Sequence, residues 1–117
     1  MIQSDNSKRA AGADEARVLR SYYSDPAPIG DGIIATLKGK SWGRAVNLIC
    51  YFTDEKTGAN FSISVFRSRK DGESYCADDQ NVDFSEPNIV GKSFKLDIQK
   101  SPRAKFPKLT AAKVSLK

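Results

Sequence analysis

The chain has 117 residues, enough for one domain with a single hydrophobic core, and 39% of them are hydrophobic. The formal net charge is +5, and the sequence contains no histidine, which excludes histidine-dependent catalytic triads. The longest apolar stretch, Leu48 to Phe52, is far shorter than the roughly 20 residues that cross a bilayer, so we expect no membrane partner.

The first 28 residues are predicted to form a mobile tail. Small and charged residues dominate this segment, and the pattern allows a short helix at Ala13–Arg20. Pro26 and Pro28 forbid a helix beyond that point and keep their neighbours extended. The first 20 residues lack the apolar core of a secretory signal, so the cytoplasm is the expected location.

From residue 33 onward, apolar and polar residues alternate with a period of two, which predicts β-strands. The expected strands are Ile33–Lys38, Arg44–Thr53, Asn60–Arg67, Lys92–Gln99 and Lys108–Leu116. Turns are expected at Gly39–Gly43 and Asp54–Gly58, and Glu73–Ala77 allows a further short strand. A β-bulge near Ala112 would bring the apolar residues of the last strand onto one face.

Five main strands with a long connection after the third match the outline of an OB-fold. That fold is a five-stranded barrel whose ligands lie across strands 2 and 3 and the loops after strands 1 and 4. We therefore predict an all-β protein, with a five-stranded OB-like barrel over residues 29–117 and a mobile N-terminal tail over residues 1–28. SH3-like barrels and small sandwiches have similar numbers of strands and remain alternatives.

The two cysteines are predicted to be free thiols. Cys50 lies within an apolar strand, on the same side as Leu48 and Phe52, where a thiol behaves as a small hydrophobe. A disulfide to Cys76 is not expected, because cytoplasmic cysteines are usually reduced. Without histidine or a C-x-x-C pair, a zinc site is not expected either, and we predict no cofactor.

Charge is sorted into blocks along the chain. Residues 71–91 carry six acidic and no basic side chains, whereas residues 92–117 carry eight basic and one acidic. Such sorting favours a polarised surface that steers a charged partner. The acidic block contains the main carboxylate cluster, Asp78, Asp79, Asp83 and Glu86. Paired carboxylates are able to hold Mg²⁺ for nuclease chemistry, but a solvated acidic loop is the simpler interpretation, so we expect no catalysis.

Basic and aromatic residues occur together in the two loops that an OB barrel would bring together. Cations follow the phosphates of a single strand, and aromatic rings stack on its bases. Two further rings project from the non-core faces of strands and extend this platform. The candidate nucleic-acid-binding residues are Lys40, Trp42, Arg44, Tyr51, Phe66, Lys100, Arg103, Lys105, Phe106 and Lys108.

Each candidate also has a purely structural interpretation. Trp42 is suited to capping one end of a barrel, and Phe106 to being buried. Tyr51 and Phe66 are suited to covering a second apolar face of the sheet. Lysines on a final strand protect its edge from pairing with neighbouring molecules.

The C-terminal hairpin resembles a known family. The segment Val90–Ile98, VGKSFKLDI, followed by a basic loop and Phe106–Leu109, FPKL, is similar to the closing hairpin of small phage and plasmid single-stranded DNA-binding OB proteins. The resemblance implies a cytosolic replication or recombination accessory, often a homodimer. The acidic tails of that family are C-terminal, whereas this C-terminus is basic, so partner recruitment through such a tail is not implied.

We therefore expect a non-catalytic protein that binds single-stranded DNA or RNA. The alternative is a protein-binding inhibitor or adaptor of phage or plasmid type, which would engage a protein partner through the acidic segment 71–91. A strongly salt-dependent affinity for single strands distinguishes the first function from the second.

Overall fold

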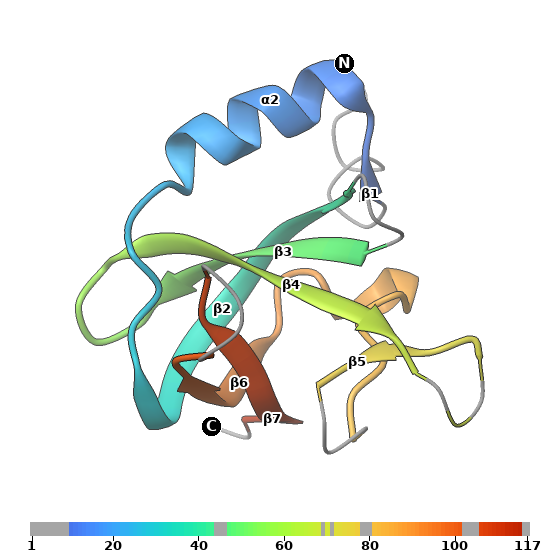
Figure 1. Ribbon diagram of the computed structural model, residues 1–117. Helices are drawn as coiled ribbons and strands as arrows, with labels where there is room; N and C mark the ends of the chain where they lie inside the picture. The colour runs from blue at the N-terminus through green and yellow to red at the C-terminus, as the bar shows by residue number, and fades with distance from the viewer. Residues whose placement is uncertain are drawn as a thin grey trace.

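The computed structural model describes residues 10–43, 47–68, 70, 72–77, 81–101 and 106–115. These residues include seven strands and one α-helix (Figure 1). The elements are β1 (Ala10–Ala11), α2 (Ala13–Tyr22), β2 (Gly30–Trp42), β3 (Asn47–Asp54), β4 (Asn60–Arg67), β5 (Tyr75–Cys76), the 3₁₀ turn η1 (Pro87–Ile89), β6 (Ser93–Gln99) and β7 (Lys108–Val114). The predicted β-rich class is confirmed.

One strand, β2, joins the two halves of the sheet. The strand order is β5-β4-β3-β2-β6-β7, with every neighbour antiparallel, and the short β1 runs parallel to β2. The first half of β2 pairs with β6 and the second half with β3, while Ala35 and Thr36 pair with both. Cα atoms of β4 and β7 approach within 8 Å, but no hydrogen-bonded ladder joins these strands in the described residues, so the sheet is open rather than a closed barrel.

The turn predicted at Gly39–Gly43 is wrong, because β2 continues through Trp42. Leu37 pairs with Phe52 and Gly39 with Tyr51, which leaves Lys38 as the extra residue of a bulge. A bulge shifts the alternation of side chains by one position. As a result, residue 40 points to the interior and residue 39 to the outer face, which the unbroken sequence pattern does not predict.

The core lies between the two halves of the sheet. On β3, β4 and β6, the alternating apolar residues on the inner side are buried: Leu48, Cys50, Phe52, Phe61, Ile63, Val65, Phe94, Leu96 and Ile98. Phe52 stacks on Phe61 at a centroid distance of 5.6 Å and meets Phe84 and Phe94 edge-on. Cys50 is buried and free, as predicted. The bulge of the last strand is present, although the register shifts at Thr110 rather than near residue 112.

Part of the predicted tail is folded onto the sheet. The helix expected at Ala13–Arg20 is present as α2, and it lies on the side of β2 and β3 turned away from β6 and β7 (Figure 1). Ala16 and Tyr23 are buried, and the ring of Tyr23 lies 5.5 Å from that of Tyr51. The predicted boundary at residue 28 is therefore not where the packed structure begins.

Candidate nucleic-acid interface

Lys40, which the sequence predicted to contact phosphate, lies in the interior with 3% of its surface exposed. Its ammonium donates to the carbonyl oxygens of Phe84, at 3.0 Å, and Glu86, at 2.8 Å. Burial lowers the pKa of Lys40 because it penalises the charged form, and nearby negative groups partly offset this effect. The assignment of Lys40 as a binding residue is wrong: it ties the segment before η1 to the sheet.

Tyr51 lies on the outer face of β3, as the alternation predicted, but it is not accessible there. It is fully buried, with the ring of Tyr23, the residue that follows α2, 5.5 Å from its own, and its hydroxyl shares a hydrogen bond of 2.6 Å with the hydroxyl of Ser41. A ring in this position is unable to stack on a base while α2 is in place. The predicted orientation of Tyr51 is therefore right and its predicted accessibility is wrong.

Three aromatic side chains of the predicted site are exposed. Phe66, on the outer face of β4, is 58% exposed, and Phe106, just before β7, is 72% exposed. Trp42 is 52% exposed at the end of β2, where it meets Tyr75 of β5 edge-on at 5.1 Å. The buried alternative for Phe106 is therefore wrong, whereas Trp42 partly fits the predicted barrel cap.

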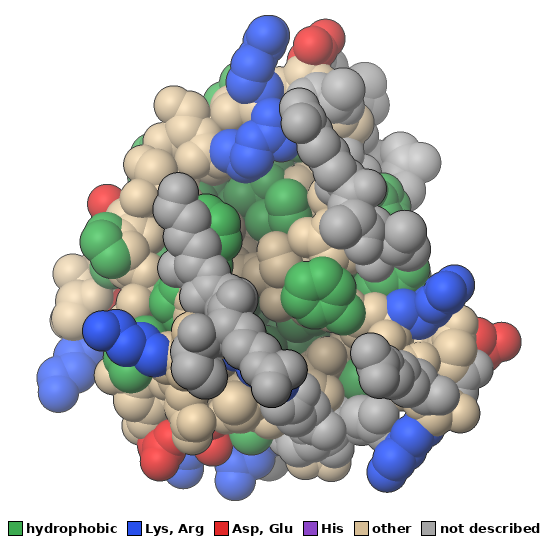
Figure 2. Space-filling model, in the orientation of Figure 1, with side chains coloured by type: hydrophobic (Ala, Val, Ile, Leu, Met, Phe, Trp, Pro, Cys, Tyr) green, Lys and Arg blue, Asp and Glu red, His purple; other side chains and the backbone are tan. Residues whose placement is uncertain are grey.

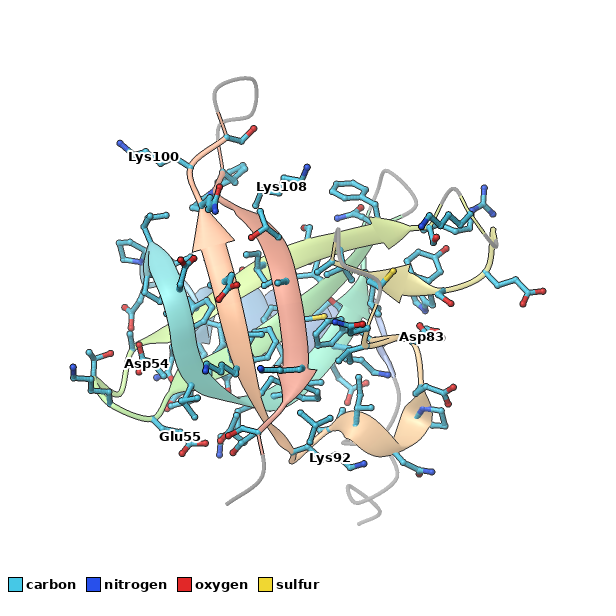
Figure 3. All side chains as sticks on the ribbon, turned by 90° about the horizontal axis from the view of Figure 1, so that it is seen from below. Asp54, Glu55, Asp83, Lys92, Lys100 and Lys108 are labelled. Carbon is cyan, nitrogen blue, oxygen red and sulfur yellow. The ribbon has the colours of Figure 1, made fainter. Side chains whose placement is uncertain are left out.

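Two of the predicted cations lie together at one end of the β6–β7 hairpin. Lys100 directly follows β6, and Lys108 begins β7, where it pairs with Gln99; both lysines are exposed (Figure 3). Arg44, Arg103 and Lys105 fall outside the described residues. The structure thus leaves Trp42, Phe66, Phe106, Lys100 and Lys108 as accessible candidates.

The face shown in Figure 2 is apolar near its middle and charged, with both signs, at its margin. Hydrophobic side chains lie near the centre of this face, and Lys, Arg, Asp and Glu side chains lie around its rim. Isolated apolar residues are common on protein surfaces, but a group of them with a polar rim marks an interaction site.

Asp83, from the predicted carboxylate cluster, has a structural role. Its Oδ1 accepts hydrogen bonds from the backbone N–H of Tyr75, the backbone N–H of Ser85 and the hydroxyl of Ser85, at 3.0, 3.0 and 2.7 Å. Three donors on one carboxylate oxygen fix the turn that follows β5. Asp78 and Asp79 lie outside the described residues, and the described ones include no group of three or more side chains placed to hold a metal ion.

Sequence reasoning missed Tyr75, the ring against which Trp42 packs. The only signal was the short alternation at Glu73–Ala77, of which Tyr75–Cys76 forms β5. Two residues are too few for a periodicity to establish a strand or its facing side.

No protein-family model matches the chain, and neither the curated proteins nor the solved structures contain a significant match. Within the described residues, no helix is both long and apolar enough to span a membrane.

Proposed function

We propose that the protein binds single-stranded nucleic acid, without catalysis, on the outer face of β3 and β4 and the loops beside it. The strand order supports an OB-like architecture built from β2, β3, β4, β6 and β7. In an OB-fold, the first strand is followed by a meander, and a later hairpin returns beside it; the barrel is partly open. Here β2 pairs with both β3 and β6, and β7 comes close to β4.

The observation that carries the proposal is the placement of three exposed rings. Phe66 lies on the outer face of β4, the third strand of such a barrel. Trp42, which pairs with Leu48, ends β2 on the inner side of the sheet, and Phe106 lies just before β7, the strand that approaches β4. Lys100 and Lys108 supply positive charge where β6 ends and β7 begins. Stacking rings with neighbouring cations are the features that bind single strands without sequence preference.

Fluorescence anisotropy with labelled oligonucleotides tests the function. Single-stranded DNA, single-stranded RNA and duplex DNA, each of about 16 nucleotides, are titrated with the full chain at about 50 and 200 mM salt. We expect single strands to bind more tightly than duplex and to lose affinity as salt rises. No binding to any single strand at the lower salt concentration would overturn the proposal. A stoichiometric protein complex that persists at high salt would then favour the inhibitor or adaptor function.

A further inference from the structure

The rings of Tyr51 and Phe66 belong to the same outer face of the sheet. In the register between β3 and β4, Tyr51 pairs with Ser62, and Asn47 pairs with Phe66. Because side chains two residues apart along a strand share a face, Ser62 and Phe66 lie on one side, together with Tyr51. Phe66 is exposed, whereas Tyr51 is fully buried, with Tyr23, the residue that follows α2, packed against its ring. The face is thus half open and half closed by the protein's own N-terminal segment.

The N-terminal segment closes this face through the two-residue pairing of β1 with β2, the buried Ala16 and a few side chains of α2 and the residue after it. Leu19 lies over Gly39, where an added Cβ would be 3.7 Å from its Cδ1, and Tyr23 packs on Tyr51. On the other side of α2, Val18 and Tyr22 are exposed. A helix of ten residues is marginal on its own, and elements with few buried apolar contacts open at low free-energy cost.

A firm anchor follows the helix directly. The backbone N–H of Asp25 donates to the carbonyl oxygen of Asn60 at 3.0 Å, and the N–H of Asn60 donates to Oδ2 of Asp25 at 2.9 Å. This reciprocal pair holds the chain on the start of β4. Movement of β1 and α2 would therefore pivot at Ser24 and would break only the two-residue pairing of β1 with β2.

We infer that β1 and α2 form a displaceable cover over a second base-stacking site, the ring of Tyr51. A single strand that stacks one base on Phe66 reaches this covered half of the face by lifting α2 about the pivot before Asp25. The inference rests on the proposed function, because the ligand that displaces the cover is the same single strand. The cover lowers the apparent affinity by the fraction of molecules in which it is open.

Matched substitutions on α2 test the cover. Leu19→Asp removes the contact with Gly39, whereas Val18→Asp adds the same charge on the exposed side of the helix. With an open fraction of about 10% in the parent protein, Leu19→Asp raises the affinity for single-stranded DNA about tenfold relative to Val18→Asp. The double variant Leu19→Asp with Tyr51→Leu keeps an apolar side chain at residue 51 but lacks the ring. It should lose the gain in affinity for single-stranded DNA.

Hydrogen exchange provides a measurement on the unmodified protein. Amides of α2 are expected to exchange faster when single-stranded DNA is bound, while amides of β3 and β4 do not. If Leu19→Asp fails to fold by circular dichroism, the pair Leu19→Ala and Val18→Ala replaces the charged pair. The inference of a displaceable cover would be overturned if the matched variants bound with equal affinities and the exchange of α2 amides did not change. The proposed function would still stand in that case. Absence of binding in the parent and in both variants would overturn both.

Discussion

The buried ammonium of Lys40 donates to the carbonyl oxygen of Phe84 at 3.0 Å, and this contact connects the last part of β2 to the segment before η1. Phe84 is itself buried in the aromatic core beside Phe94. A charged side chain thus positions a loop whose aromatic ring completes the core. In the described residues, no buried side-chain nitrogen or oxygen lacks a hydrogen-bond partner.

Lys40→Met should destabilise the protein by about 1–3 kcal/mol, because two carbonyl oxygens lose a buried donor. Lys38→Met is the matched control, since Lys38 is exposed, and it should change stability by no more than about 0.5 kcal/mol. Urea denaturation measures both. A control that is as destabilised as Lys40→Met would contradict the structural role, as would a change in the salt dependence of nucleic-acid binding in Lys40→Met.

Cys50 should reduce stability at alkaline pH. Burial raises the pKa of its thiol from 9.0 to about 12. The unfolded thiol ionises first, so the stability held by the protonated thiol is present below pH 9 and is lost as pH rises toward 12, by at most about 1.4 kcal/mol per pH unit. Cys50→Ala lacks this loss, so the stability difference between parent and variant should shift in favour of the variant between about pH 8 and pH 10. A constant difference in urea midpoints would count against this assignment.

Phe66→Ala and Trp42→Ala should each weaken single-strand binding by about 1–3 kcal/mol, the range for one stacked base. The salt dependence should not change, because stacking releases no counterions. Val114→Ala, a truncation of another exposed apolar side chain, serves as the control. The chain contains one tryptophan, so Trp42 fluorescence also reports directly on stacking. Unaltered affinity in both folded variants would show that the ligand lies elsewhere.

Lys100→Ala and Lys108→Ala should weaken binding to all single strands alike. Each lost phosphate contact flattens the slope of log affinity against log salt by about 0.7. Lys92 lies at the opposite end of the β6–β7 hairpin from these two lysines, which makes Lys92→Ala the matched control (Figure 3). Equal slope changes in all three variants would indicate a general charge effect rather than a local contact.

Asp83 offers a test of its structural role against a metal-binding one. Asp83→Asn keeps the oxygen that accepts three hydrogen bonds and removes the charge, whereas Asp83→Ala removes the acceptor. Asp83→Ala should lose about 1–3 kcal/mol of stability, and Asp83→Asn clearly less. Equal losses by thermal unfolding, or a stabilisation of the parent protein by Mg²⁺ that Asp83→Asn abolishes, would contradict this role.

Strand positions were predictable because they depend on local alternation. The predicted strand Asn60–Arg67 has the same bounds as β4. The alternation along β6 places its buried residues, Phe94, Leu96 and Ile98, on one side. The direction of Lys40 was not predictable, because a bulge at Lys38 next to a glycine resembles a turn in the sequence. Bulges depend on the pairing of the neighbouring strand, which local sequence does not contain.

The candidate site was only partly predictable, for a similar reason. The exposure of Phe66 was predictable, because the alternation of side chains along its strand places it on the outer face. Burial of Tyr51 depends on α2, a segment whose contribution to packing comes from only a few side chains, such as Ala16, Leu19 and Tyr23. Composition alone made this segment look like a tail, because the apolar residues that pack on the sheet are few and widely spaced.

The shared strand β2 has a consequence for synthesis on the ribosome. Its second half finds its partner, β3, almost as soon as the chain emerges, whereas its first half waits for β6, which lies near the other end of the sequence. Until then, the inward side chains of Ile33, Ala35 and Leu37 have only part of their final cover. Pairing between segments so distant in sequence is slow to form. The nascent chain therefore carries an unpaired strand edge until β6 has emerged, and the β6–β7 hairpin completes both the core and the protection of that edge.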